Sequence, residues 1–230
     1  MNISVAMAVY NGQKYLKEQI ESILHTLEDH DELIISVDPG TDDSEAIIQS
    51  FPDPRIHTIQ GPGKGTTGNF ENAIQHCQNE IIFLSDQDDI WMPEKRKKVL
   101  AAFDPETMVV LHDAIVVDDQ MHCIHPSFFD HRGTKLGIHH NILKNSYMGC
   151  CMAFRKDMVS VITPFPKDLP MHDQWIGLCG EKLGHNKLIH EPLLIYRRHE
   201  ENASAMEHAD MVQMIQWRFY LIKHLKKIQS

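Results

Sequence analysis

Short apolar runs alternate with segments of helical periodicity along the first 103 residues of the chain. Four of these runs have the length of buried strands, at residues 3–9, 33–37, 55–59 and 81–84. Each is followed by apolar residues at helical spacing, at residues 15–27, 44–51, 69–77 and 94–103. Strands that alternate with helices in this way form a parallel sheet with helices on both faces. The sequence therefore predicts an α/β fold with a mostly parallel sheet.

Polar residues follow each predicted strand. They are Tyr10 and Asn11, Asp38, the glycine-rich stretch 61–68 and the acidic run 85–89. Because the carboxyl ends of parallel strands meet at one edge of a sheet, these loops are expected to line a single crevice there. We expect the functional site at that edge.

The second half of the chain is less regular. Its apolar segments predict strands at 108–117 and 149–154, a loop at 128–137 and a helix at 172–183. The last segment, 206–228, has apolar residues spaced for one face of a helix and lysines near its end. A single large domain can accommodate 230 residues. We therefore expect one domain over 1–205, with halves at 1–104 and 105–205, followed by an amphipathic helix at 206–230.

The chain is acidic, with 22 Lys and Arg against 32 Asp and Glu and a net charge of −10. This balance argues against a nucleic-acid partner, which needs a basic surface. Five cysteines without CxxC spacing, and a start without signal-peptide features, indicate a reducing cytoplasm. No apolar run reaches the length of a membrane span. For the basic end of the last helix two interpretations remain, packing on the domain or peripheral contact with an anionic membrane or a partner.

The acidic run 85–89 is a candidate site for a divalent metal ion. Residues two apart on an extended backbone share a side, so Asp86 and Asp88 are expected to converge on one cation while Asp89 turns away. Their hard oxygens suit Mg²⁺ or Mn²⁺ carried by a diphosphate. An acidic turn that caps a helix starting near Pro93 fits the same residues. Spacing alone leaves both interpretations open.

Four motifs in order make the chain resemble a family-two glycosyltransferase of the GT-A fold. They are VYNG at 9–12, VDPGTDD at 37–43, SDQDDIW at 85–91 and MHD at 171–173. The ordered set, which runs from residue 3 to about 204, is more specific than any one motif. Within the family the chain is most similar to bacterial rhamnosyltransferase-like members. The resemblance implies a Rossmann-like sheet flanked by helices, and an inverting transfer from a nucleoside-diphosphate sugar that depends on Mg²⁺ or Mn²⁺.

The resemblance also assigns roles on the donor side. It places Tyr10 and Asn11 in the first nucleotide loop, Asp38 at the nucleotide base, Asp86 near ribose and sugar, and Asp88 at the metal. His199, which follows the last predicted strand, is expected to reach the metal or the diphosphate. Two further donor-side candidates are Lys64 and Asn69, although Asn69 fits a helix cap equally well.

Sugar transfer needs a general base for the acceptor hydroxyl. The resemblance assigns this role to Asp173, whereas the sequence alone favours a carboxylate that caps the helix at 172–183. His172 is expected to orient the base or contact the acceptor. Trp175 is expected to offer an apolar platform to a sugar ring, with core packing as the alternative. Gly149 would let a sugar or a backbone approach closely.

Two departures from the family pattern keep other functions open. Pro39 stands where the family usually has a second Asp, and His172 precedes Asp173 where Glu is common. A non-catalytic nucleotide-sugar-binding module fits these departures. The other alternative is a His/Asp metal hydrolase that uses residues such as His112 and Asp113, although the chain lacks paired-histidine spacing such as HExxH.

The resemblance favours particular substrates. It implies a dTDP-rhamnose donor, with UDP-hexoses as the next choice. The acceptor would be a growing surface polysaccharide or another glycan, including one on a lipid carrier at the inner face of the membrane.

Overall fold

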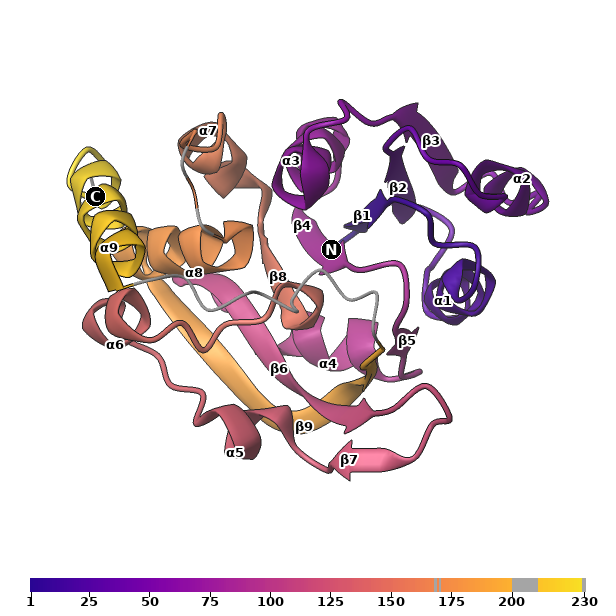
Figure 1. The fold of residues 1–230 in the computed structure, drawn as a ribbon. Helices are drawn as coiled ribbons and strands as arrows, with labels where there is room; N and C mark the ends of the chain where they lie inside the picture. Colours follow the sequence, from indigo (N-terminus) through magenta and orange to yellow (C-terminus); the bar gives the residue numbers. More distant parts are fainter. Residues whose placement is uncertain (168, 170, 200–210, 229–230) are drawn as a thin grey trace.

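The computed structural model describes residues 1–167, 169, 171–199 and 211–228. One curled sheet runs through this part of the chain, and helices cover both of its faces (Figure 1). The predicted α/β class is confirmed.

The parallel half of the sheet comes from the first 85 residues. Its strands are β1 (Ile3–Val9), β2 (Glu32–Val37), β3 (Ile56–Gln60) and β4 (Ile81–Ser85). β1 pairs in parallel with both β2 and β4, and β2 pairs in parallel with β3. The connecting helices are α1 (Leu16–Leu24), α2 (Ser44–Gln49) and α3 (Gly65–His76). The predicted βα repeat is confirmed, because strands buried on both faces carry unbroken apolar runs.

The second half adds strands of both directions. β6 (Thr107–Val117) pairs antiparallel with β8 (Met152–Arg155) and parallel with β9 (His185–Arg197). β8 also pairs antiparallel with β4, which joins the two halves. Two short strands, β5 (Ile90–Trp91) and β7 (Cys123–His125), pair antiparallel with β9 and β6. The order is β3-β2-β1-β4-β8-β6-β9-β5, so the sheet is parallel in its first half and mixed in its second.

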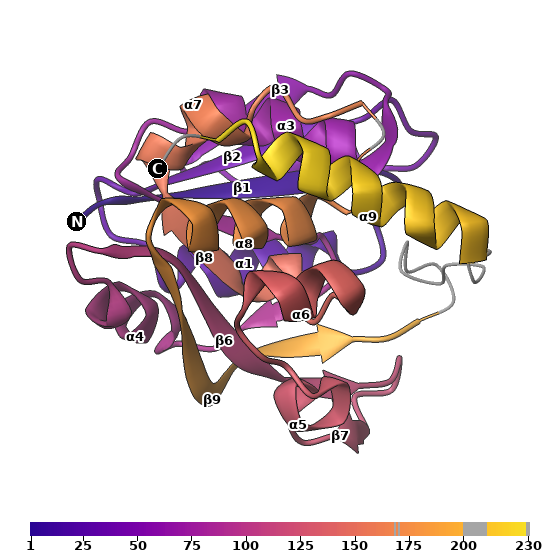
Figure 2. The same cartoon turned by 90° about the vertical axis from the view of Figure 1, so that its left-hand side faces the viewer.

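Helices of the second half cover the mixed part of the sheet. They are α4 (Lys95–Ala102), α5 (Phe128–Arg132), α6 (Ile138–Leu143), α7 (Val159–Ile162), α8 (His172–Leu183) and α9 (Met211–Leu225). Two 3₁₀ turns, η1 (Gly149–Cys151) and η2 (Lys156–Met158), flank β8. α8 has the predicted bounds, and α9 packs against it (Figure 2). No helix in the described ranges is long and apolar enough to cross a bilayer.

The core lies on both faces of the sheet. On one face, Ile3, Val5 and Met7 of β1 pack in a cluster with apolar residues of α1. On the other face, the core includes Phe70 of α3 and Ile176 of α8. Alternate residues of a strand point to opposite faces, so burial on both faces fixes the strand register. The register in turn fixes where the loops at the strand ends lie.

Two predicted segments differ in local structure. The predicted strand at 149–154 begins with the turn η1 and becomes extended only at Met152. The predicted loop at 128–137 contains α5. Ser127 caps this helix by accepting a hydrogen bond from the Asp130 N–H, and Gly133, with φ of 71°, ends it. A helix this short has no apolar periodicity to reveal it.

Two predicted helix starts also differ. α3 begins at Gly65 and not at residue 69, so Asn69 lies inside the helix. The predicted start of the last helix at 206 lies outside the described residues, and its described part begins at Met211.

Candidate active site

The loops after β1 and β2 meet at the carboxyl edge of the parallel half. Val9 and Val37, the last residues of these strands, are directly paired. A cavity of about 220 Å³ opens here, lined by Asn11, Val37, Asp38, Gly40, Asp42, Ser44 and Glu45. Two of the predicted donor-binding residues, Asn11 and Asp38, therefore share one cavity.

Asp38 is held in place by the glycine-rich stretch after β3. Its side chain is buried, and Oδ1 accepts a hydrogen bond from the Gly63 N–H at 2.8 Å. A Cβ atom on Gly61 would lie 2.3 Å from the same oxygen, so only glycine allows this approach. The glycine-rich stretch thus positions a carboxylate at the cavity.

Tyr10 and Asn11 form the loop after β1. Asn11 has a left-handed backbone, with φ of 48°, and its Oδ1 accepts a hydrogen bond from the Thr41 N–H at 2.9 Å. The exposed Tyr10 exchanges two hydrogen bonds with the Gln87 amide, at 2.8 and 3.0 Å. Gln87 therefore fastens this loop to the acidic run. No local pattern predicts this role, because the two residues are 77 positions apart in the chain.

The acidic run bends after β4, and the bend decides which carboxylates converge. Carboxylate oxygens of Asp86 and Asp89 and the thiol of Cys150 all lie within 4.8 Å of one another. The prediction that Asp89 turns away is wrong, because strand alternation stops at the bend over residues 87–88. Asp89 is fully buried and accepts a hydrogen bond from the Arg197 N–H at 3.1 Å. It thereby holds the end of β9.

Burial governs the charge of this cluster. It raises the pKa of Asp86 to about 7, and the nearby charges of Asp88 and Asp173 add to the rise. Burial also raises the pKa of Asp89 well above its ordinary value, with the same help from neighbouring carboxylates. The carboxylates do not cap the next helix, because α4 begins after Glu94 without a side-chain cap. The capping interpretation of the acidic run is therefore wrong.

The counter-charge to the cluster is Lys95 of α4, which is fully buried. Its Nζ donates to the Cys150 carbonyl oxygen at 2.8 Å and lies 4.0 Å from the centroid of the Trp91 ring. Burial lowers the pKa of Lys95 to about 8, and the carboxylates of Asp86 and Asp89 oppose the fall. Sequence reasoning missed Lys95 because it opens a run of four basic residues, 95–98, that is typical of an exposed helix face.

Asp88 faces His199, the second residue after the end of β9. Its Oδ2 lies 2.8 Å from His199 Nε2, and both side chains are largely buried. Burial raises the pKa of Asp88, and the hydrogen bond with His199 opposes the rise. The two predicted metal ligands, 111 positions apart, are thus brought together. A carboxylate oxygen beside an imidazole nitrogen suits Mn²⁺ better than Mg²⁺, which prefers oxygen ligands throughout, and either metal would take further ligands from phosphate and water.

Tyr15, which precedes α1, holds the segment that carries His199. Its ring lies 4.8 Å from the His199 ring, and the Arg197 guanidinium lies 4.4 Å from its centroid. The Tyr15 hydroxyl donates to Asp119 at 3.2 Å, and Arg197 forms an ion pair with Glu18 of α1 at 2.6 Å. Tyr15 had appeared in the sequence only as the start of a helix.

Asp173 lies in the first turn of α8 and is buried. Its Oδ1 accepts a hydrogen bond from the Gln174 N–H at 2.6 Å, and the backbone of Gly149 also bonds to the carboxylate. Burial raises the pKa of Asp173 to about 6. The N-cap position of α8 is Met171, so Asp173 is not the N-cap residue, although its bond to the Gln174 N–H does stabilise the first turn of the helix. The charge of Asp173 reaches Asp86, which places both carboxylates in one site.

His172 packs between α3 and η1. Its ring stacks on Phe70, with centroids 4.3 Å apart, and burial lowers its pKa to about 4, so the ring is neutral near neutral pH. Nε2 has no hydrogen-bond partner among the described residues. A Cβ on Gly149 would lie 3.2 Å from this nitrogen. The absent side chain of Gly149 thus makes room for His172.

Three other predicted site residues take different places. Trp175 lies in the core, where its Nε1 donates to the Ile162 carbonyl at 3.0 Å, so the prediction of an open sugar platform is wrong. Asn69 is buried and its Nδ2 donates to the Val9 carbonyl at 3.1 Å, which secures the end of β1. Lys64 is exposed at the residue before α3.

The residues proposed for a metal hydrolase are used within the fold. His112 Nδ1 lies 2.8 Å from the Asp113 carbonyl oxygen. The Asp113 carboxylate accepts hydrogen bonds from the Phe129 N–H and the Ser127 hydroxyl, which attaches α5 to β6. Among the described residues, three ligand atoms come close enough to hold a metal in the Asp86 cluster, to which neither His112 nor Asp113 belongs. These contacts give the hydrolase interpretation no support.

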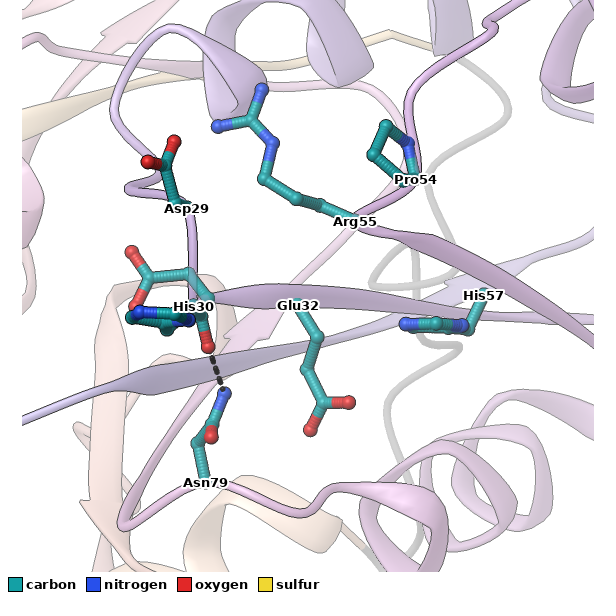
Figure 3. Close-up of a pocket in the computed structure, with 8 residues that line it drawn as sticks. Asp29, His30, Glu32, Pro54, Arg55, His57 and Asn79 are labelled. Atoms are coloured by element: carbon teal, nitrogen blue, oxygen red, sulfur yellow. Dashed lines mark hydrogen bonds between the residues drawn. The ribbon is translucent and has the colours of Figure 1, made fainter.

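A second cavity, of about 230 Å³, lies at the opposite, amino-terminal edge of the parallel half (Figure 3). Its lining includes Glu32 and His57 near the starts of β2 and β3, and Asn79 before β4. The Asn79 amide donates to the His30 carbonyl at 3.1 Å. None of the predicted site loops contributes to this cavity.

Comparison with known proteins identifies related sequences. Residues 4–163 match the family described as Glycosyl transferase family 2. The uncharacterized glycosyltransferase alr2836 of Nostoc sp. is 28% identical over 218 residues, which cover 88% of this chain and 66% of that protein. The dTDP-rhamnosyl transferase RfbG of Shigella flexneri is 24% identical over 220 residues, covering 85% of this chain and 72% of RfbG. The chain thus spans roughly two thirds of the length of these relatives.

Comparison of folds gives a consistent result. The chain is similar to S. aureus TarS in complex with UDP-GlcNAc, with a TM-score of 0.73 and 16% sequence identity. The match covers 97% of this chain and 66% of the TarS chain. The predicted GT-A fold is therefore confirmed.

Replacing Lys95 with Met tests the counter-charge. The variant leaves the Cys150 carbonyl and the buried carboxylates without their cation, so we expect the free energy of unfolding to fall by about 3 kcal/mol at about pH 7.5. The loss should shrink at about pH 5.5, where carboxylates with raised pKa values take up protons in the folded state. Urea unfolding at both pH values measures the effect.

Lys97 provides the matched control, since its side chain is 81% exposed. Lys97→Met should change the free energy of unfolding by no more than about 0.5 kcal/mol. Equal losses for the two variants would show that Lys95 does not compensate the cluster.

Proposed function

The chain belongs to glycosyl transferase family 2, and on this premise we propose that it transfers a sugar from a nucleoside diphosphate to a hydroxyl of a glycan acceptor, with inversion and a divalent metal. Two contacts with the acidic run support the proposal most. Gln87 of that run bonds to Tyr10 in the loop that borders the cavity at Asp38, and Asp88 bonds to His199. The buried carboxylate of Asp173 adds to them, because its charge acts on Asp86. Residues 1–104 would bind the donor, and residues 105–205 would receive the acceptor.

The cavity at Asp38 suits a pyrimidine base. Uracil and thymine both present a ring N–H between two carbonyl groups. A carboxylate fixed in position can accept a hydrogen bond from this N–H. Asn11 shares the cavity, and the exposed Tyr10 lies beside it in sequence on the same loop. We therefore propose a dTDP-sugar or a UDP-sugar as donor. The name of RfbG, a dTDP-rhamnosyl transferase, supports rhamnose as the sugar to test first.

The leaving group is a nucleoside diphosphate whose growing charge has to be neutralised. Asp88 and His199 would hold Mg²⁺ or Mn²⁺, which supplies this neutralisation when bound. Asp86, partly buried and close enough to Asp88 to be affected by its charge, would contact ribose or sugar. Tyr15 and Asp89 fix the end of β9 and so position His199 for this role.

Asp173 would act as the general base. The acceptor oxygen attacks the anomeric carbon on the face opposite the diphosphate, the bond from that carbon to the phosphate oxygen breaks, and the hydroxyl proton passes to the Asp173 carboxylate. The raised pKa of Asp173, about 6, makes the carboxylate a better proton acceptor than an exposed one and leaves it ionised near neutral pH. His172, neutral and stacked on Phe70, forms a rigid wall beside it.

We propose a surface polysaccharide or a lipid-linked glycan as acceptor, and a location in the cytoplasm at the inner face of the membrane. A reducing compartment fits the five cysteines, all of which are free of disulfides.

A thermal-shift screen of nucleoside diphosphates and their sugars tests the donor site. With Mn²⁺ present, a dTDP-sugar or UDP-sugar at about 100 times its Kd should raise the melting temperature by about 5 °C or more. Asp88→Asn should remove the part of the shift that needs metal, whereas the exposed control Asp157→Asn should retain it. A flat response to every nucleotide would contradict the proposal.

Replacing Asp173 with Asn separates catalysis from binding. The amide is isosteric but cannot take up the acceptor proton, so transfer should fall by about a hundredfold or more while donor affinity stays within about twofold. Release of nucleoside diphosphate measures turnover, and the thermal shift measures affinity. Unchanged turnover would remove Asp173 from the role of base. If the wild-type chain binds donor but transfers no sugar, the non-catalytic binding module would be favoured.

The pH dependence of transfer should report the Asp173 carboxylate. Because the base works only when ionised and burial raises its pKa to about 6, kcat/KM should fall by about tenfold per pH unit below that value. The profile is measured at saturating metal with the wild-type chain. If kcat/KM instead began to fall only at about pH 4, the ordinary pKa range of Asp, the base would not be this buried carboxylate.

A further inference from the structure

α9 has a buried face and an exposed apolar face. Leu221 and Leu225 are buried against the rest of the molecule. On the outside, Met211 is 75% exposed, Val212 64%, Ile215 49% and Phe219 71%. Residues 211, 215 and 219 are four apart and form one stripe along the helix.

A further exposed apolar residue lies on α6, which packs against α9. Leu143, at the end of that helix, is 64% exposed, and its carbonyl accepts a hydrogen bond from the Arg218 guanidinium at 2.7 Å. We define the α9 patch as Met211, Val212, Ile215, Phe219 and Leu143. Isolated exposed apolar residues are ordinary, but a contiguous set of this kind marks an interaction surface.

The charged side chains of residues 211–228 all have one sign. Residues 211–228 include four basic residues, Arg218, Lys223, Lys226 and Lys227, and no acidic one, although the whole chain has a net charge of −10. At 100° per residue, Lys226 falls on the same side of the helix as Ile215 and Phe219. The outer face of α9 is therefore apolar in its first turns and cationic in its last.

We propose that the α9 patch docks on an anionic lipid bilayer surface. The lysines of the last turn meet acidic headgroups, and Phe219, Ile215 and Met211 enter the boundary between headgroups and acyl chains. A second copy of the chain fits this face less well, since a symmetric contact would bring a second set of the same cations against it.

The position of the helix gives this docking a consequence. α9 packs on α8, the helix that carries Asp173, and starts on the side of the molecule toward which β9 runs (Figure 2). A bilayer held by α9 would thus lie beside the acceptor half. This consequence rests on the proposed function, because it would bring a lipid-linked acceptor to the site; the docking itself does not need the reaction.

Vesicle flotation with the full chain tests the proposal. We expect binding to vesicles that contain phosphatidylglycerol, little binding to pure phosphatidylcholine, and weaker binding as salt rises. Ile215→Ser with Phe219→Ser, and separately Lys223→Gln with Lys226→Gln, should each lower partitioning by about tenfold or more. The melting temperature of each variant without ligand should stay close to that of the wild type, which shows that the fold is intact.

Matched controls lie away from α9. Ile124→Ser on β7 removes another apolar side chain, 45% exposed, and Lys97→Gln on α4 removes another exposed cation. Both should leave vesicle binding unchanged. Equal binding to neutral and anionic vesicles, no binding to either, or a dimer in light scattering that only the patch variants dissociate would each overturn the proposal. None of these results depends on whether the chain transfers a sugar.

Discussion

Burial of several carboxylates at the end of β4 is the constraint on which the rest of the site depends. An unpaired buried charge is costly, so each carboxylate needs a compensating group. Asp89 accepts a hydrogen bond from the Arg197 N–H of β9, and Asp88 is hydrogen-bonded to the His199 ring. The ammonium group of Lys95 from α4 donates to the Cys150 carbonyl beside these carboxylates. These groups come from elements far apart in the chain, and the carboxylates therefore hold together parts of both halves.

The same contacts explain the shape of the second half. β9 runs parallel to β6 and ends where Asp89 and Tyr15 hold its last residues. The turn η1 brings the thiol of Cys150 to the acidic cluster and leaves space at Gly149 for His172. The mixed part of the sheet thus delivers a histidine, a thiol and the start of α8 to the edge where the parallel part ends. This convergence makes one site from two halves of the chain.

Contacts also separate the interpretations that the motifs left open. The carboxylates of the acidic run do not cap the next helix, because α4 begins without a side-chain cap. Asp173 does bond to the first-turn Gln174 N–H of α8, but its charge also acts on Asp86 of the acidic run. A hydrolase site would need His112 and Asp113 to face a metal, yet Asp113 is engaged with α5. Trp175 packs in the core because its ring is surrounded by apolar residues of α7 and α8.

The sequence by itself determined the βα repeat, the edge at which its loops gather and the residues at the ends of those loops, because apolar periodicity and strand polarity are local properties. It also supplied the motifs that identify the family. Only the tertiary structure decided that Asp89 joins Asp86, that Lys95 is buried as their counter-charge and that Tyr15 supports His199. Those outcomes depend on a bend in the backbone and on contacts between residues far apart in the chain, which no local pattern encodes.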